Sequence, residues 1–239
     1  LALPAPTAEP LGDITLPLAP FRELLAPLPA LHFGIECALL HLLQGNRGIL
    51  FPTPFTAGNA TLPTHGLIWM DTPAALLAQV QAKVDAGFTV IKMKVGADTW
   101  QQELALLTTM RARFPQIELR LDANCSFTPA TVLERLEELA PLQIAFLEEP
   151  LRFADNALER ARELCAASPI PLALDETLLS AAATRDYASL LNEVRPAHVI
   201  LKPSLLGGLA QTLEIIAICD ELGIAWWINS LLESSVGHS

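Results

Sequence analysis

Acidic side chains follow three apolar segments of the sequence at nearly equal intervals. The stretches LRLDAN, AFLEEP and LALDET supply Asp122, Glu148 and Asp175. Three carboxylates provide the hard oxygen ligands that suit Mg²⁺ or Mn²⁺, with the remaining octahedral positions left to water and substrate. The sequence has no HExxH or HxH motif, so a zinc site is not expected. A lone acid at a strand end is often a helix cap or a surface ion pair, but three in register favour a metal site.

Lysines stand in two other apolar segments. VIKMKVG contains Lys92 and Lys94, and VILKPS contains Lys202. In a strand, Lys92 and Lys94 share one face because successive side chains alternate. An ammonium buried without carboxylate partners is costly or loses its proton. Two lysines flanking a divalent metal can take an α-proton from a carboxylate substrate while the resulting enediolate is stabilised. The pattern therefore predicts a small-molecule carboxylate as substrate.

The elements that carry these side chains alternate between strands and helices. The polar strand ends at residues 94, 122, 148, 175, 202 and 229 are 26 to 28 residues apart. This period favours a β/α barrel, in which catalytic groups lie at the C-terminal ends of the strands, over a doubly wound open sheet. We expect strands at 66–70, 88–94, 117–122, 144–149, 171–176, 198–202 and 224–229, with helices at 72–87, 98–114, 128–139, 155–167, 180–192 and 208–222.

The composition excludes several classes of function. Hydrophobic residues make up 51% of the 239 residues, and the net charge is −11 without a basic cluster, so nucleic acid and anionic membrane surfaces are disfavoured as partners. No apolar run has the roughly 18 residues of a membrane span. The four cysteines are far apart, and the first residues lack the basic region of a signal peptide. We therefore expect a reduced, cytoplasmic protein, and an oligomer is compatible with this sequence.

Further polar residues are candidates for substrate binding or support. Asn124 follows Asp122 by two positions, and a polar group follows the last strand: Asn229, Ser230, Ser234 and Ser235. These could hydrogen-bond a substrate carboxylate, although ordinary loop polarity is the alternative. Glu149 and Glu176 stand next to predicted ligands and are expected to orient lysines or ligands. Cys125 is interpreted as a packing residue.

At these motifs the sequence resembles the enolase superfamily, in its muconate-lactonizing-enzyme-like branch. The resemblance covers residues 88 to 235 and is carried by Lys92-Met93-Lys94, Asp122-Ala123-Asn124, Glu148-Glu149-Pro150, Asp175-Glu176 and Lys202-Pro203. Within the branch, RLDAN, IAFLEEPL, ILKPSLLGG and SLLESSVG are most similar to the o-succinylbenzoate synthase family of menaquinone biosynthesis. LHFGIECALLHLL resembles the end of that family's capping domain.

The resemblance implies roles for the residues named above. Asp122, Glu148 and Asp175 would bind Mg²⁺, Lys94 would be the general base and acid, Lys202 would stabilise the enediolate, and Lys92 would be a supporting cation. The implied reaction is a syn β-elimination that dehydrates a hydroxylated cyclohexadiene carboxylate to 2-succinylbenzoate. An N-acylamino acid or dipeptide racemase/epimerase and a cycloisomerase could use the same site, and a barrel that only binds a ligand is a third alternative.

The resemblance also sets the expected fold class and domains. We expect a (β/α)7β TIM-like barrel over residues 64–239, truncated at the C-terminus before an eighth strand, and a partial α+β N-terminal capping domain over residues 1–63. The antiparallel strands that begin such a cap are not recognisable, and Asn229 replaces part of a Ser-rich turn usual in the family. An open barrel would leave two strand edges unpaired, so the sequence is expected to be incomplete.

Overall fold

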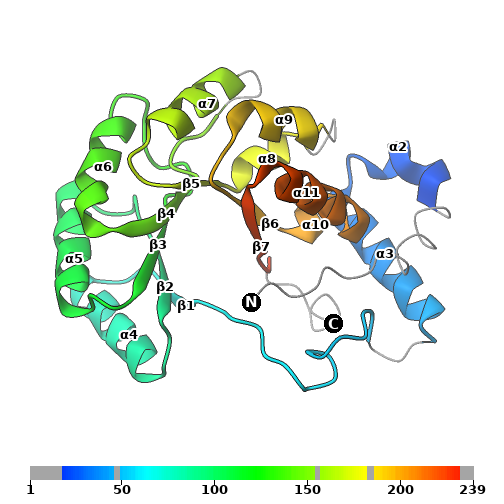
Figure 1. Cartoon of the computed structure of the whole chain (residues 1–239), viewed down its shortest axis with the longest axis horizontal. Coiled ribbons are helices and arrows are strands. Elements are labelled where there is room, and N and C mark those ends of the chain that lie inside the picture. The colour runs from blue at the N-terminus through cyan, green and yellow to red at the C-terminus, as the bar shows by residue number, and fades with distance from the viewer. Residues whose placement is uncertain (1–17, 46–48, 154–156, 182–185, 232–239) are drawn as a thin grey trace.

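Seven parallel strands form one sheet in chain order, β1 to β7 (Figure 1). The structure is a computed structural model that describes residues 18–45, 49–153, 157–181 and 186–231. The sheet curls into part of a barrel with the helices on its outer side (Figure 1), and β1 and β7 are its two edges. The strands are β1 Gly66–Ile68, β2 Val90–Lys94, β3 Glu118–Asp122, β4 Ile144–Glu148, β5 Leu172–Leu174, β6 His198–Leu201 and β7 Ala225–Ile228.

One longer helix follows each of the first six strands. These helices are α4 Pro73–Asp85, α5 Trp100–Arg113, α6 Val132–Leu139, α7 Leu158–Ala167, α9 Tyr187–Val194 and α11 Leu209–Leu222. Local sequence sets their ends: Pro73 opens α4 at a position where its missing N–H costs nothing, and Gly223 closes α11 in the left-handed conformation (φ 68°). The alternation of parallel strands and helices confirms the α/β class and is consistent with a TIM-type barrel.

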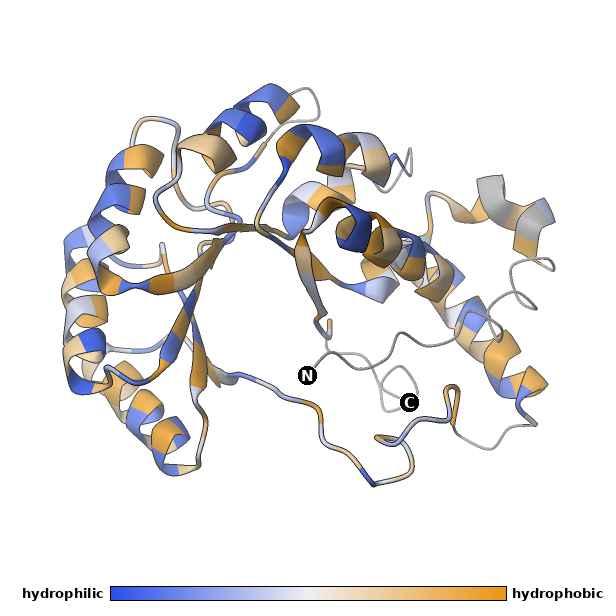
Figure 2. Ribbon diagram, viewed as in Figure 1, coloured by the Kyte–Doolittle hydropathy of each residue, from blue (hydrophilic) through white to orange (hydrophobic). Residues whose placement is uncertain are grey.

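The main hydrophobic core lies between the sheet and these helices. Fully buried strand residues such as Ile91, Leu119 and Leu147 pack there with Leu107, Leu136 and Leu191 from the helices. Figure 2 shows the matching pattern, with hydrophilic residues gathered on the outer sides of the helices. The opposite face of the sheet carries a smaller cluster of Phe146, Ala173 and Ile200. Burial on two faces explains why the strands are nearly continuous apolar runs.

Three short helices between β3 and β7 were not expected from the sequence. They are η2 Ala140–Leu142, α8 Glu176–Ser180 and α10 Pro203–Leu206, of which α8 and α10 directly follow Asp175 and Lys202. In addition, α9 begins at Tyr187 and not at residue 180, because the Asp186 side chain accepts a hydrogen bond from the Ser189 backbone N–H at 3.1 Å and caps the helix there. A four-residue helix has no room for the 3.6-residue periodicity on which the sequence prediction depended.

The N-terminal region packs against the barrel through one helix. Its elements are η1 Ala19–Phe21, α2 Arg22–Leu25 and α3 Pro29–Leu43, and α3 lies against α10. The buried Glu36 side chain accepts a hydrogen bond from the Leu209 backbone N–H at the start of α11. Over 18–45 and 49–63 the structure contains helices but no strand, so the β part of the expected capping domain is not confirmed. The boundary at residues 63 and 64 stays a prediction.

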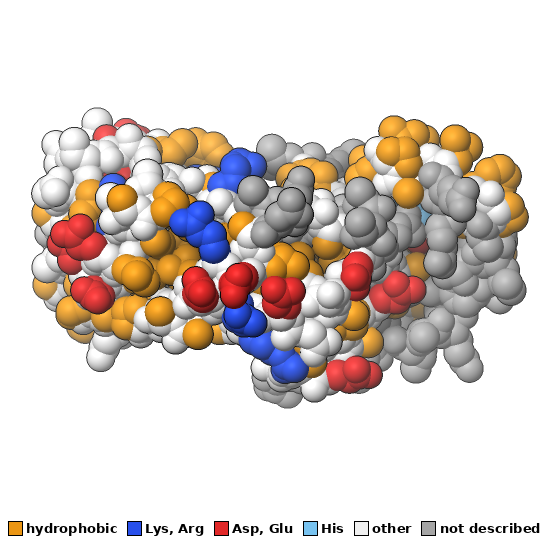
Figure 3. All heavy atoms as spheres, turned by 90° about the horizontal axis from the view of Figure 1, so that it is seen from above, with side chains coloured by type: hydrophobic (Ala, Val, Ile, Leu, Met, Phe, Trp, Pro, Cys, Tyr) orange, Lys and Arg blue, Asp and Glu red, His pale blue; other side chains and the backbone are white. Residues whose placement is uncertain are grey.

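The face of the molecule seen in Figure 3 carries both acidic and basic side chains. Figure 3 shows acidic and basic side chains mixed over one face, with hydrophobic side chains gathered at the end that carries α2 and α3. Exposed hydrophobic residues at that end include Phe21, Leu24 and Leu31. Within the described ranges, no helix combines the length and the hydropathy that crossing a membrane requires.

Candidate active site

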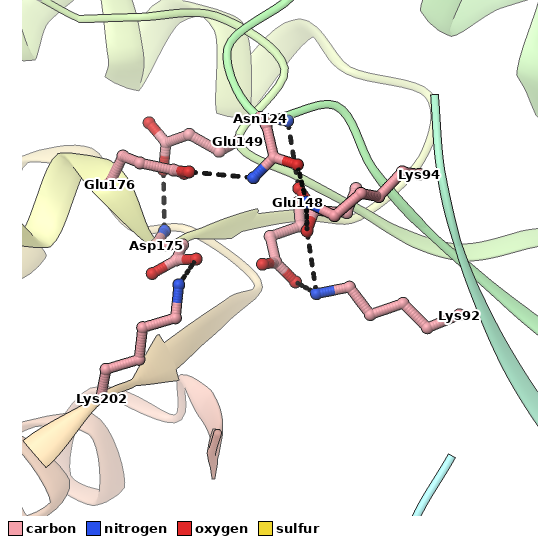
Figure 4. A network of polar contacts seen from close by, with 9 residues as sticks. Lys92, Lys94, Asn124, Glu148, Glu149, Asp175, Glu176 and Lys202 are labelled. Atoms are coloured by element: carbon pink, nitrogen blue, oxygen red, sulfur yellow. Dashed lines mark hydrogen bonds and ion pairs between the residues drawn. The ribbon is translucent and has the colours of Figure 1, made fainter. Parts of the chain in front are cut away.

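The predicted catalytic and metal-binding residues lie at the C-terminal ends of neighbouring strands. The register pairs Lys94 with Asp122 and Asp122 with Glu148, so three neighbouring strands end in a row of polar side chains. Asp175 follows β5 and Lys202 follows β6 directly, which continues the row. The C-terminal ends of parallel strands lie on the same side of the sheet. Side chains that follow successive strands in the sequence are therefore neighbours in space and can form one site. Figure 4 shows Lys202 pointing toward Asp175 and Lys92 pointing toward Glu148.

Lys92 forms the centre of the buried charge network. Its Nζ lies 2.6 Å from Glu148 Oε2 and 3.0 Å from Asp122 Oδ2, and the residue is only 4% exposed (Figure 4). Burial works to lower the pKa of Lys92, but the carboxylates of Glu148 and Asp122 outweigh it and hold the pKa above its ordinary value. The expectation that a buried lysine on this strand needs carboxylate partners is therefore confirmed.

The other two lysines lie on either side of the carboxylates. The Lys202 ammonium is paired with Asp175, and the Lys94 ammonium donates a hydrogen bond to Asn124 while lying 3.9 Å from Asp122 Oδ2. Their side chains are 16% and 27% exposed, so both can be reached from solvent, unlike Lys92. Two accessible amines that face a buried acidic cluster form a geometry suited to proton transfer.

The three predicted metal ligands do not converge on one point in this structure. In the described part of the chain, one group of three potential ligands has all its ligand atoms within 4.8 Å of one another, and it consists of Cys125, Glu149 and Glu176. Asp122 and Glu148 face Lys92, and Asp175 faces Lys202. Each predicted ligand is thus turned toward a lysine, because a buried carboxylate needs a nearby positive charge.

The donor set nevertheless fits a divalent cation. Glu148 is 1% exposed and its Oε1 has no hydrogen-bond partner among the described residues, which leaves a buried acceptor available to an ion. Burial and the neighbouring Asp122 carboxylate raise the pKa of Glu148, so an additional positive charge would be stabilising there. All three donors are carboxylates, the ligand type that Mg²⁺ and Mn²⁺ share. We therefore retain Asp122, Glu148 and Asp175 as the candidate metal ligands.

Glu149 supports a predicted metal ligand, as expected from the sequence, whereas Glu176 contacts Asn124, which is neither a lysine nor a predicted metal ligand. Glu149 is fully buried, and it accepts hydrogen bonds from the Asp175 backbone N–H at 2.7 Å and from the Thr177 hydroxyl. Burial raises its pKa to about 7 although these hydrogen bonds oppose the shift. Glu176 accepts a hydrogen bond from Asn124 Nδ2 at 3.0 Å. Glu149 thus orders the backbone that carries Asp175, and Glu176 orders Asn124.

A structural carboxylate that the sequence analysis missed holds the turn after β2. Glu103 Oε1 accepts hydrogen bonds from three consecutive backbone N–H groups, those of Gly96 at 2.7 Å, Ala97 at 2.9 Å and Asp98 at 3.1 Å. Gly96 has a φ of +97°, and a β-carbon there would overlap the Ser126 side chain. The turn directly follows Lys94, so Glu103 fixes the end of the strand that carries this lysine. An acid in the first turn of α5 was the signal available in the sequence.

Replacing Glu103 by alanine should destabilise the protein by about 1–3 kcal/mol, because three backbone donors lose their acceptor. For a chain of this size the thermal midpoint should fall by roughly 3–10 °C. Glu103→Gln keeps an acceptor oxygen, so its free energy of unfolding should fall by less than that of Glu103→Ala. Glu134→Ala on the exposed surface of α6 is the control and should stay within about 0.5 kcal/mol of the parent. Equal midpoints for the Glu103 and Glu134 variants would contradict this account of the turn.

The remaining predicted residues lie further along the edge or outside the described ranges. Asn229 follows β7 level with Lys202, and its backbone N–H donates to the Leu201 carbonyl at 2.8 Å. Ser230 follows Asn229, whereas Ser234 and Ser235 lie outside the described residues. Cys125 is half-buried, and burial with nearby carboxylates raises the pKa of its thiol to about 12, which suits a packing residue better than a nucleophile.

Comparison with known proteins places this site in a family. Residues 75–239 match the family model described as enolase C-terminal domain-like. An o-succinylbenzoate synthase from Desulfotalea psychrophila is 41% identical over 211 residues, which are 87% of this chain. The chain belongs to the enolase superfamily. The crystal structure of MenC from the same organism superposes with a TM-score of 0.82 at 40% identity over 87% of this chain.

This enolase-superfamily chain is also similar to a member of the superfamily with a different activity. An L-Ala-D/L-Glu epimerase from Francisella tularensis is 26% identical over 211 residues and 87% of the chain. The chain spans 56% of the length of the Desulfotalea synthase, 58% of the epimerase and 58% of the solved MenC chain.

Proposed function

We propose that the protein is an o-succinylbenzoate synthase, a metal-dependent carbon–oxygen lyase. The observation that carries this proposal is the pair of solvent-reachable lysines, Lys94 and Lys202, on either side of a buried carboxylate row. The 41% identity to a synthase, against 26% to the epimerase, supports this activity within the superfamily. The substrate would be a hydroxylated cyclohexadiene carboxylate and the product 2-succinylbenzoate.

The proposed chemistry assigns one proton path to Lys94. Neutral Lys94 takes the proton from the carbon next to the substrate carboxylate, and the electron pair of that C–H bond moves into an enediolate. The neighbouring C–O bond then breaks, hydroxide takes a proton from Lys94 and leaves as water, and the ring becomes aromatic. This path begins and ends with neutral Lys94, so one residue serves as base and acid on one face, as a syn elimination requires. Lys202, on the other side, stabilises the negative charge as an ammonium.

Lys92 would act through charge alone. Its ammonium is buried between Glu148 and Asp122 and forms ion pairs with both, so it orders the acidic row and does not need to exchange a proton. Asp122, Glu148 and Asp175 would hold a Mg²⁺ or Mn²⁺ ion. When bound, such an ion would supply positive charge that stabilises the dianionic form of the substrate carboxylate. We further propose that Asn229 and Ser230, with Ser234 and Ser235, help to bind substrate.

Direct assay of the dehydration tests the proposed function. The purified full-length protein with Mg²⁺ should convert the cyclohexadiene substrate to 2-succinylbenzoate, followed by the absorbance of the aromatic product. The same preparation should be incubated with an N-succinyl amino acid in deuterated water, because an epimerase would exchange the α-hydrogen of both enantiomers. Exchange that outpaces dehydration would assign the protein to the racemases, the alternative that the epimerase match keeps in view.

Removing the metal or its ligands should abolish the activity. A chelator should reduce dehydration to background and added Mg²⁺ should restore it. Asp122→Asn, Glu148→Gln and Asp175→Asn should each weaken Mg²⁺ binding, measured by calorimetry, by about 10-fold or more, because each exchange removes a charged ligand. Asp98→Asn, an exposed acid in the turn after β2, is the control and should bind Mg²⁺ as the parent does. Unchanged affinity in all three site variants would exclude this carboxylate row as the metal site.

A further inference from the structure

Asn124 joins the proposed base to an acidic side chain on another strand end. The Lys94 ammonium donates a hydrogen bond to Asn124 Oδ1, and Asn124 Nδ2 donates to Glu176 Oε1 at 3.0 Å (Figure 4). Lys94 ends β2, Asn124 follows β3, and Glu176 begins α8 after β5. The chain of contacts therefore links three segments that are far apart in the sequence.

The chemistry of the amide suits this place. An ammonium can only donate hydrogen bonds and an ionised carboxylate can only accept them, so a group that bridges the two must accept on one side and donate on the other. The Asn124 side chain does both, with its oxygen toward Lys94 and its nitrogen toward Glu176. An aspartate of the same shape would accept from Lys94 but repel Glu176.

The backbone holds Asn124 in the geometry that the bridge needs. Its φ is 42°, in the left-handed region that asparagine tolerates better than most residues. The Asn124 backbone N–H donates to Asp122 Oδ1 at 3.1 Å, and the next N–H, that of Cys125, donates to the Glu149 carbonyl at 2.7 Å. These backbone contacts do not depend on the Asn124 side chain, so the side chain can be removed while the turn is kept.

We propose that Asn124 is a positioning residue for Lys94 and that Glu176 acts on Lys94 through Asn124. A lysine side chain is long and flexible, and a hydrogen bond that fixes its nitrogen ahead of the reaction places the base where the proton is taken. This inference rests on the proposed role of Lys94 as the base, and it differs from the sequence-based prediction that Asn124 binds substrate. The two roles separate in kinetics, because positioning the base affects kcat and binding substrate affects KM.

Asn124→Gly tests the role of the side chain, since glycine adopts a φ of 42° without strain. We expect kcat for dehydration to fall about 10- to 100-fold with KM within about 2-fold of the parent. The deuterium isotope effect at the abstracted position should rise, because proton transfer becomes more rate-limiting. Gln143→Gly is the matched control, an exposed amide residue in a left-handed turn (φ 51°) before β4, and should leave all three quantities unchanged.

Glu176→Gln and the double variant test the second step. Glu176→Gln alone should lower kcat by a smaller factor, and adding it to Asn124→Gly should lower kcat no further, because its effect passes through the missing amide. Multiplied effects in the double variant would overturn the action of Glu176 through Asn124. A rise in KM with unchanged kcat and isotope effect in Asn124→Gly would overturn the positioning role. If Asn124→Gly does not fold by circular dichroism, Asn124→Ser serves in its place with the same expectations.

The positioning role of Asn124 can be tested even if the proposed synthase activity is wrong. If the parent protein exchanges the α-hydrogen of an N-succinyl amino acid and does not dehydrate the cyclohexadiene, the synthase proposal fails. The same variants are then compared by the rate of that exchange, which also needs Lys94. A 10- to 100-fold slower exchange in Asn124→Gly supports the positioning role, and an unchanged rate overturns it.

Discussion

Lys94→Arg should lower the rate of dehydration by about 10⁴-fold, because a guanidinium stays protonated and cannot act as a base. Lys202→Arg should cost only about 10-fold, because in the synthase mechanism this residue contributes positive charge and arginine keeps it. Both effects should be measured as kcat at saturating Mg²⁺ on variants whose circular dichroism matches the parent. A much larger loss of activity in Lys94→Arg than in Lys202→Arg would assign Lys94 as the base and Lys202 as the stabilising cation.

The same pair of variants distinguishes the alternatives. In a racemase both lysines exchange protons with the substrate carbon, so both arginine variants would fail equally. The chain contains four lysines, and the fourth, Lys83, lies on α4 away from the site. Lys83→Arg therefore controls for the general effect of the exchange and should keep full activity. Substantial dehydration by the Lys94→Arg variant would contradict the assignment of Lys94 as the base.

Lys92→Met should destabilise the protein by about 3–5 kcal/mol in the absence of divalent metal, because it leaves Asp122 and Glu148 buried without their shared cation. In a chain of this size the thermal midpoint should fall by roughly 6–20 °C. Added Mg²⁺ should raise the midpoint of the variant more than that of the parent, since the ion then supplies the missing charge to the same carboxylates. Differential scanning calorimetry with and without Mg²⁺ measures both effects.

Lys83→Met is the matched control for this experiment. Lys83 is half-buried and lies 5.2 Å from the centre of the Phe88 ring, so its loss should cost no more than about 1 kcal/mol. If Lys92→Met were as stable as Lys83→Met without metal, the network around Lys92 would not be a source of stability. If Mg²⁺ raised both midpoints equally, the ion would not share carboxylates with Lys92.

The strand-end pattern allowed most of the site to be predicted from the sequence. Side chains in one row of a parallel sheet come from regularly spaced positions, so Lys94, Asp122 and Glu148 could be brought together before their pairing was seen. The same logic placed Asp175 and Lys202 at the neighbouring strand ends. Alternation along β2 also placed Lys92 on the same face as Lys94, and the cost of burying an ammonium predicted that it needs carboxylate partners.

The parts that escaped prediction depend on contacts without periodicity. An acid in the first turn of α5 is visible in the sequence, but that Glu103 accepts from three N–H groups of the preceding turn depends on the geometry of that turn. The bridge that Asn124 makes between Lys94 and Glu176 joins turns that are far apart in the sequence, so no local pattern indicates it. Asp175 pairs with Lys202 and does not converge on Asp122 and Glu148. Which buried charges pair depends on their energies in the folded protein, and the spacing of the strands in the sequence does not determine it.

The contact between Glu36 and α11 bears on how the chain unfolds. Glu36 accepts from the first N–H of α11, and Leu209 and Leu213 of that helix pack on Cys37, Leu40 and Leu50 from the N-terminal region. A break between these parts would leave a helix end without its acceptor and an apolar surface in water. The N-terminal region and α11 should therefore unfold together. Unfolding by denaturant and cleavage by protease should show a single cooperative transition, and not two domains that separate near residue 63.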